Sequence, residues 1–176
     1  MSEGDGPLHP PQDGGLELRD PEHRVSTRAV AYWTTESLIG QVIFLAILTG
    51  VYLFALPERW WWATAILVVA AVVALVDILV KPRYRYAVHR WEVTPTAVYT
   101  RTGWVTREQR IAPLSRVQTV DSKQGPLMRM FKIASITVTT ASAAGPISIV
   151  GLDKDVAERL VAELTEITGS IEGDAT

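Results

Sequence analysis

The sequence predicts a two-helix transmembrane hairpin, followed by a mainly antiparallel β sandwich or barrel that ends in an amphipathic helix. Three observations carry this prediction. Two apolar runs, residues 38–56 and 60–80, are separated by only three residues. From residue 84 the polarity alternates with the two-residue period of strands, and near the end apolar residues return at helical spacing. Short strands followed by one amphipathic helix are typical of a small sandwich or barrel whose open end the helix covers.

Residues 1–23 are rich in Gly, Pro and acidic residues and poor in apolar ones. Such a composition buries too little apolar surface to offset the entropy of ordering the chain. We therefore expect a disordered N-terminal tail. We expect no signal peptide, because the start is acidic and no apolar core follows within the first 30 residues.

Residues 24–37 are predicted to lead the chain into the membrane. Ser26 or Thr27 is in position to cap a helix that runs into the first span. Basic side chains at headgroup level and aromatic ones in the interfacial belt fit this role, and here they are Arg24, Arg28, Tyr32 and Trp33.

The two apolar runs have the length of bilayer-spanning helices. At about 1.5 Å per residue, each covers roughly 28–31 Å, which is about the hydrocarbon thickness. Pro57 ends the first run, and the short link leaves room only for a tight turn. Ala70 and Ala74, four residues apart, place small side chains on one face of the second helix, where the first helix can approach closely.

The placement of Lys and Arg predicts the orientation. The link between the spans holds Arg59 alone, whereas the flanks hold Arg24, Arg28, Lys81, Arg83, Arg85 and Arg90. The positive-inside bias therefore places both termini in the cytoplasm. We expect a two-span protein of the cell (inner) membrane.

Asp77 is the one carboxylate within a span, and Lys81 follows one helical turn later. The spacing predicts an intramembrane polar pair between Asp77 and Lys81 near the cytoplasmic end. An acid inside a span can also mark an ion path. A small transporter component that uses Asp77 and Gln41 is therefore a further, weaker hypothesis.

Residues 84–168 are predicted to form a cytoplasmic domain. A short helix or loop is expected at 125–131, an amphipathic helix at 154–167 ended by Gly169, and a polar tail at 169–176. The strands are predicted at residues 84–94, 97–101, 104–111, 117–121, 136–140 and 147–150.

This region resembles the bacterial pleckstrin-homology-like (PH-like) domain of YdbS-like membrane proteins. The resemblance lies in Tyr84-Arg85-Tyr86, the hairpin AVYTRTGWVTREQR, the segment IAPLSRVQTV, the turn QGPL with Phe131, and the strand ITVTTAS. Together with HRVSTRAVAYW and the hairpin, it covers roughly residues 22–168. One departure is Lys132, where members often have glycine. The resemblance implies a PH-like fold of two packed antiparallel sheets with a C-terminal helix, and it implies no established activity or ligand residues.

Little in the sequence points to catalysis. The chain has no cysteine, which excludes disulfides, thiolate metal sites and cysteine nucleophiles. No P-loop, nucleophile elbow, dinucleotide fingerprint or HExxH motif is present. His89 is expected to be a neutral surface side chain, and a pairing with Ser115 for hydrolysis has little support. We expect no enzyme, no catalytic or metal-binding residues and no cofactor.

Residues 81–132 form a basic block, with eleven Lys or Arg against three acids, and this block is the feature of the sequence that suggests a binding role. Our first hypothesis is a non-enzymatic adaptor or assembly module that forms homo-oligomers or binds related membrane proteins. The alternative is binding of anionic lipid headgroups by the basic domain. Nucleic acid is not an expected partner. The candidate headgroup contacts are Lys81, Arg83, Arg85 and Arg90.

Overall fold

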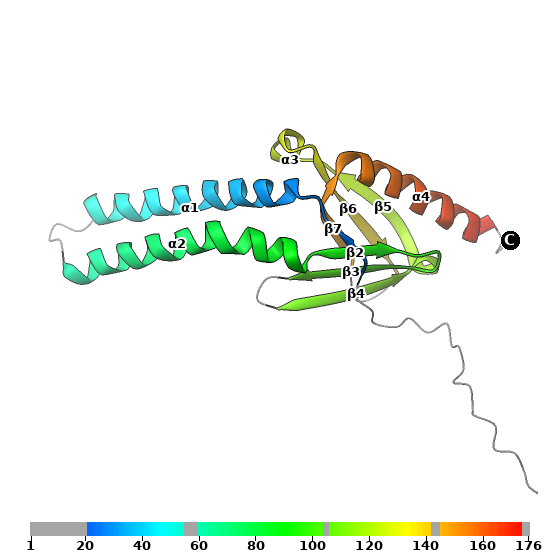
Figure 1. Cartoon of the computed structure of the whole chain (residues 1–176), viewed down its shortest axis with the longest axis horizontal. Helices are drawn as coiled ribbons and strands as arrows, with labels where there is room; N and C mark the ends of the chain where they lie inside the picture. Colours follow the sequence, from blue (N-terminus) through cyan, green and yellow to red (C-terminus); the bar gives the residue numbers. More distant parts are fainter. Residues whose placement is uncertain (1–20, 55–59, 104–105, 142–144, 174–176) are drawn as a thin grey trace, which may run out of the picture.

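The structure is a computed structural model that describes residues 21–54, 60–103, 106–141 and 145–173. Most of the predicted N-terminal tail, the link between the spans, the beginning of the strand predicted at 104 and the last residues of the C-terminal tail lie outside the described residues. The described chain has a long helical hairpin at one end and a β domain at the other (Figure 1).

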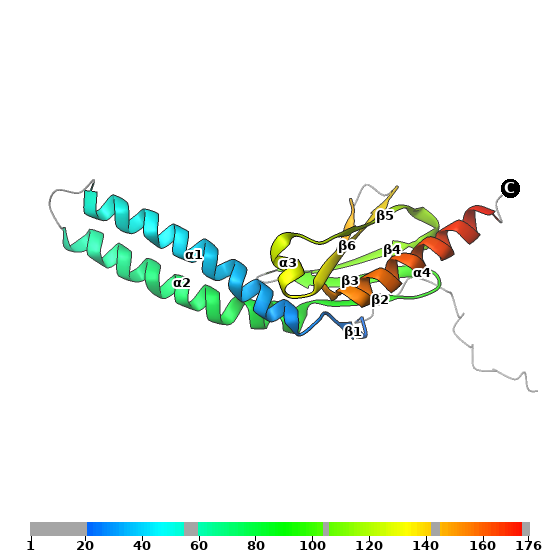
Figure 2. The same cartoon turned by 90° about the horizontal axis from the view of Figure 1, so that it is seen from above.

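The hairpin consists of α1 (Arg28–Phe54) and α2 (Trp61–Val88), which run side by side in both views (Figures 1 and 2). Both helices are long and apolar enough to cross a membrane. Most of their large apolar side chains are exposed, as expected for surfaces that face lipid. Ala63 and Ala74 of α2 are buried, so small side chains line the contact with α1.

The β domain has two antiparallel sheets, as predicted. The first has the order β1-β2-β3-β4 and the second the order β5-β6-β7. The strands are β1 (His23–Arg24), β2 (Arg90–Val93), β3 (Ala97–Gly103), β4 (Arg107–Pro113), β5 (Val117–Lys123), β6 (Ile133–Thr140) and β7 (Ile147–Asp153). A 3₁₀ turn, Leu114–Arg116, connects the sheets, and the short helix α3 (Pro126–Met130) joins β5 to β6.

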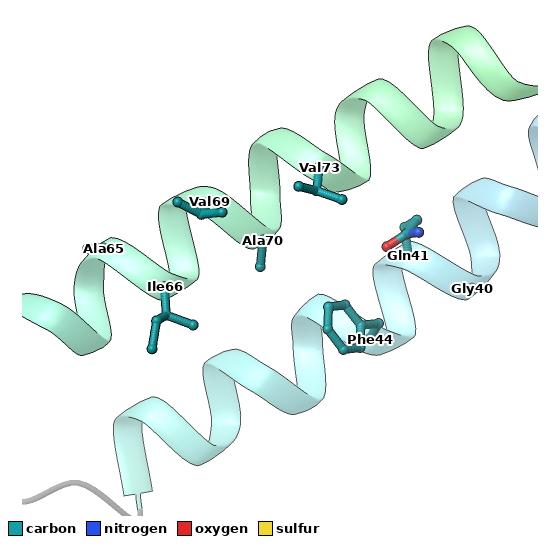
Figure 3. Close-up of a pocket in the computed structure, with 8 residues that line it drawn as sticks. All are labelled: Gly40, Gln41, Phe44, Ala65, Ile66, Val69, Ala70 and Val73. Carbon is teal, nitrogen blue, oxygen red and sulfur yellow. The ribbon is translucent and has the colours of Figure 1, made fainter. Parts of the chain in front are cut away.

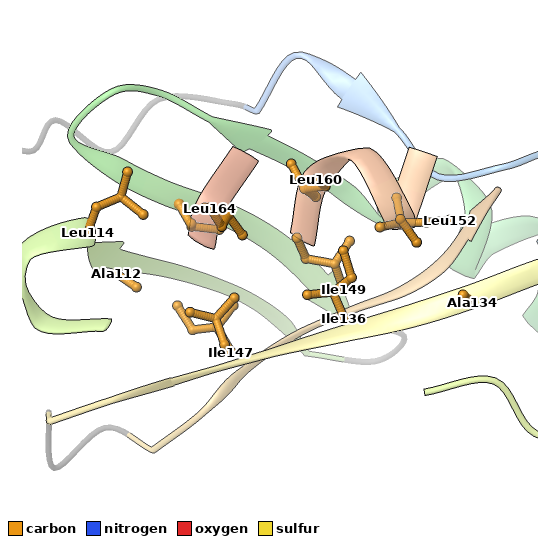
Figure 4. Close-up of a cluster of buried hydrophobic side chains, with 12 residues drawn as sticks. Ala112, Leu114, Ala134, Ile136, Ile147, Ile149, Leu152, Leu160 and Leu164 are labelled. Carbon is orange, nitrogen blue, oxygen red and sulfur yellow. The ribbon is translucent and has the colours of Figure 1, made fainter. Parts of the chain in front are cut away.

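The C-terminal helix α4 (Lys154–Gly173) packs its apolar stripe against the interior of the sandwich (Figure 4). Leu160 and Leu164 of α4 meet Ile136 of β6 and Ile149 of β7 in one buried cluster. Side chains from both sheets and the helix thus share one core, which is the PH-like arrangement that the family resemblance implies.

The first predicted strand is wrong over residues 84–88, because α2 continues through Pro82 as far as Val88. Proline removes one backbone donor from a helix. The carbonyl that loses its donor here is that of Ile78, and the neighbouring Leu79 carbonyl accepts a further bond from Arg83 Nη1 at 2.6 Å. Tyr86 packs against the start of α1, so tertiary contact outweighs the alternating pattern that suggests a strand.

Both ends of the domain also differ from prediction. His23, assigned by the sequence to the disordered tail, lies in β1 and pairs with Trp91 of β2. At the other end, α4 continues past Gly169 to Gly173. Gly169 does not adopt the left-handed backbone that would end the helix.

Candidate functional site at the membrane boundary

The first turns of α1 dock on β7 of the β domain. Val25, Ala29 and Trp33 form a buried cluster there, and Trp33 is only 2% exposed. The Ser26 backbone N–H donates to the Gly151 carbonyl at 2.8 Å. Gly151 has φ +87°, and a Cβ on it would lie 2.7 Å from the Cβ of Ala29. Glycine is therefore required here both for the backbone conformation and for the close approach of α1.

A polar clasp closes the same junction. Ser26 Oγ donates to Asp153 Oδ1 at 2.8 Å and accepts from the Arg28 backbone N–H at 3.2 Å. Arg28 Nη1 lies 3.2 Å from the same carboxylate oxygen. Asp153 directly precedes α4, so the clasp joins the segment that leads into the membrane to the C-terminal helix.

Four polar residues recur one turn apart along α2 and directly after its end: Asp77, Lys81, Arg85 and His89. Asp77 accepts from Gln41 Nε2 of α1 at 3.3 Å, and Lys81 Nζ lies 3.2 Å from its other oxygen. The Arg85 guanidinium lies 4.5 Å from the ring centroid of Trp33, within cation–π range. Side chains from both helices therefore meet at the end of the hairpin nearest the β domain.

His89 ends this series just beyond α2, and it is buried, with 6% exposure, rather than on the surface as expected. Its ring centroid lies 5.2 Å from that of Trp33, and its Nδ1 lies 2.9 Å from the Arg85 carbonyl, to which it donates in the neutral form. Burial, followed by the nearby Arg85 charge, lowers the pKa of His89 to about 4. His89 is therefore neutral at physiological pH.

These groups border a polar pocket of about 360 Å³. Two cations and two carboxylates are among the residues that line it. The full lining is Trp33, Glu36, Ser37, Gly40, Gln41, Asp77, Lys81 and Arg85. An apolar groove of about 710 Å³ adjoins it and shares Gly40 and Gln41 with it. Figure 3 shows this groove between the helices, with Ile66 and Ala70 of α2 pointing toward α1.

The structure does not bring the four candidate headgroup contacts onto one surface. Lys81 and Arg85 line the polar pocket, whereas Arg83 is exposed and bonds its own helix. Arg90 lies on β2, and its Nε is buried without a hydrogen-bond partner among the described residues. Lipid contact by these four residues stays a prediction.

Sequence reasoning missed Trp33, Glu36 and His89 as parts of this site. The helical spacing of Asp77, Lys81, Arg85 and His89 was the available signal, but it is visible only if α2 is extended through Pro82. Within the described ranges, no group of three or more His, Cys, Asp or Glu side chains could hold a metal ion.

Comparisons with known proteins agree with this architecture. The family described as "Bacterial PH domain" matches residues 38–168. The UPF0699 transmembrane protein YdbS of Bacillus subtilis (strain 168) is 27% identical over 153 residues, which cover 84% of this chain and 95% of that protein. No solved structure matches the chain. The two long apolar helices and the two-sheet domain with its closing helix accord with both matches, and the chain belongs to the bacterial PH domain family, as a YdbS-like membrane protein.

Proposed function

We propose that this chain is a non-enzymatic assembly module of the cell membrane, with both termini in the cytoplasm, whose hairpin binds the hairpin of a second copy. The apolar groove between α1 and α2 carries the proposal. It lies within the predicted spans, where lipid or another helix must fill it. Related membrane proteins with a similar hairpin are the other expected partners.

The lining of the groove suits a helix. Gly40, Ala65 and Ala70 allow a neighbouring backbone to approach closely, and Phe44 and Val69 supply larger apolar surface (Figure 3). In lipid, helices associate through such close packing and through polar groups rather than through the hydrophobic effect. Gln41 supplies a polar group at the end of the groove nearest the cytoplasm, where the polar pocket begins.

Pairing of two hairpins would also fix the relative positions of their β domains. Because α1 docks on β7 and is clasped to Asp153, two paired hairpins would hold their domains at a defined separation and orientation. β4 and β5 are terminal strands of their sheets, and terminal strands can pair with a partner strand. Association in the membrane would raise the effective concentration of these edges.

The absence of cysteine makes the chain suitable for site-specific disulfide crosslinking in native membranes. We expect Val69→Cys, in the groove, to form disulfide-linked dimers of the full-length protein. Val68→Cys is the matched control, because it is the neighbouring valine on the same helix, is similarly exposed, and does not line the groove.

Dimers through Val69→Cys and not through Val68→Cys would support self-association at the groove. Crosslinking at Val68 alone, or at neither position when the protein level is normal, would contradict it. Mass analysis of the crosslinked band separates a second copy from a related membrane protein.

Contact with anionic lipid is a second candidate function, and a different surface of the domain favours it. That surface lies beside α3, outside the hairpin groove and the polar pocket.

A further inference from the structure

The short helix α3 lies beside the first turns of α1, away from the interior of the sandwich (Figures 1 and 2). Phe131, directly after α3, meets Tyr32 of α1 edge-on, with ring centroids 6.4 Å apart. Tyr32 precedes the first apolar run by only a few residues, where aromatic side chains occupy the membrane–water interface. The α3 turn is therefore held beside the residues that lead into the first apolar run.

Met130, the last residue of α3, is 77% exposed. Among the described residues after α2, it is the large apolar side chain that the fold leaves most open to its surroundings. A flexible apolar side chain at headgroup level can bury itself in the boundary of the acyl chains. The position of Met130 is unfavourable in water and favourable against a membrane.

Lys132 follows in a strained backbone conformation. Its φ is +54°, in the left-handed region that glycine adopts freely and that costs other residues about 1 kcal/mol or more. The turn is closed on both sides, since the Lys132 N–H donates to Arg129 O and the Lys132 carbonyl accepts from the Lys154 N–H, each at 3.1 Å. Because glycine would adopt this conformation without strain, the lysine at this position marks the turn as a candidate functional site.

Lys132 borders a second polar pocket of about 360 Å³, lined by Arg28, Gln124, Arg129, Lys132, Asp153, Lys154 and Asp155. The lining holds four cations and two carboxylates. Arg28 pairs with Asp153, and Lys154 lies 3.5 Å from Glu158. Within the described part of the chain, the side chains of Arg129 and Lys132 have no such partner. Among the described residues, the pocket therefore presents two uncommitted positive charges, Arg129 and Lys132, against one uncommitted carboxylate, Asp155.

We propose that α3 is an interfacial contact for anionic lipid of the cytoplasmic leaflet. Met130 inserts at the acyl boundary, while Arg129 and Lys132 bind the phosphate of an anionic headgroup. The apolar tip, the two free cations and the adjacent span together identify the occupant as the membrane surface. This inference rests on the second candidate function, and it does not depend on self-association through the hairpin groove.

The experiment places a fluorophore at the proposed point of insertion. The full-length chain with Met130→Cys is labelled with nitrobenzoxadiazole and reconstituted in nanodiscs of phosphatidylcholine with or without phosphatidylglycerol. We expect blue-shifted emission and quenching by brominated lipid, both strengthened by phosphatidylglycerol and weakened by salt. Glu163→Cys, exposed on α4, is the control and should report water in every nanodisc.

Lys132→Gly in the Met130→Cys background separates the role of the lysine from its structural cost. The substitution should raise the unfolding temperature, because glycine relieves the strained backbone. It should also reduce, about fivefold, the effect of phosphatidylglycerol on the equilibrium between the water-exposed and the membrane-inserted probe. A change of this size is expected for the loss of one cation near an anionic surface. Arg159→Gln removes one exposed cation of α4 and should change neither quantity.

A Met130 probe that stays in water with phosphatidylglycerol would overturn the proposal, as would equal lipid responses in Lys132→Gly and Arg159→Gln. Loss of the response on adding inorganic phosphate, at constant ionic strength, would show that the pocket takes free phosphate instead of lipid. Dimers through Val69→Cys should persist in Lys132→Gly, so failure of one proposal is distinguishable from failure of the other.

Discussion

Trp33 contacts residues from several elements at the junction between the hairpin and the β domain. It is buried against β7, stacks under the Arg85 guanidinium and contacts the ring of His89. An arginine over an indole ring keeps its charge while losing part of its water. The same crowding removes water from His89, so a histidine next to a cation is kept neutral.

The low pKa of His89 predicts a loss of stability in acid. The pKa is about 4 in the folded chain and near 6.5 when unfolded, so the unfolded state binds the proton first as the pH falls. The stabilisation is complete above about pH 6.5 and is lost as the pH falls through about 4. Its size is up to about 3 kcal/mol. Unfolding of the full-length chain in detergent, followed across this range, measures it.

His89→Asn is the control for this pH dependence. Asparagine does not titrate, and its amide can still donate to the Arg85 carbonyl. The variant should have a flatter stability curve between pH 6.5 and 4. An unchanged slope would assign the acid sensitivity to other groups.

Among the contacts between secondary-structure elements, the docking of α1 on β7 joins the hairpin to the β domain. Ala29 lies against Gly151, and the backbone of Ser26 bonds the Gly151 carbonyl. The helix can approach this closely because β7 carries no side chain at that point. The clasp of Ser26 and Arg28 on Asp153 then fixes the direction in which the helix leaves the domain.

Gly151→Ala should loosen this docking. The added methyl group would meet Ala29 at 2.7 Å, and alanine tolerates φ +87° poorly. We expect a loss of about 2–4 kcal/mol in the free energy of unfolding, from backbone strain and overpacking together. Denaturant unfolding of the full-length chain in detergent measures this change.

Gly169→Ala is the matched control, since Gly169 lies within α4 with open space around its Cα. Alanine should stabilise the helix there by about 0.5–1 kcal/mol. Equal effects of the two substitutions would contradict a specific role for Gly151 in docking α1.

At the scale of the whole molecule, the hairpin and the β domain lie at opposite ends of an elongated chain (Figure 1). α1 enters the hairpin from the domain and α2 returns to it, so the two apolar helices form one unit with both of its ends on the same side. The basic residues concentrate on that side of the spans. This arrangement favours a domain that faces the cytoplasm.

The orientation predicts the accessibility of single cysteines in intact cells. A membrane-impermeant maleimide should label Glu58→Cys, between the spans and outside the described residues, without permeabilisation. Glu163→Cys on α4 should be labelled only after the membrane is opened. The reverse pattern would invert the topology.

The sequence predicts much of the fold because the relevant signals are local. The spans follow from apolar runs of bilayer length, and β3, β5, β6, β7 and α4 follow from two-residue or helical periodicity. The region of residues 82–89 is harder to predict. Pro82 and the alternation after it favour a strand, whereas contacts with Trp33, more than fifty positions earlier in the sequence, favour a helix.

The sequence by itself determined that this protein has two apolar helices, a mainly antiparallel β domain with a terminal helix, and a concentration of basic residues beside the second span. Those properties depend on composition and on the spacing of near neighbours, whereas the PH-like fold was implied by the family resemblance. Only the tertiary structure decided that His89 is buried, that α1 rests on Gly151, and that Lys132 adopts a left-handed backbone beside an exposed Met130. The physical reason is that burial and strain arise from contacts between segments far apart in the chain, and no local pattern records those contacts.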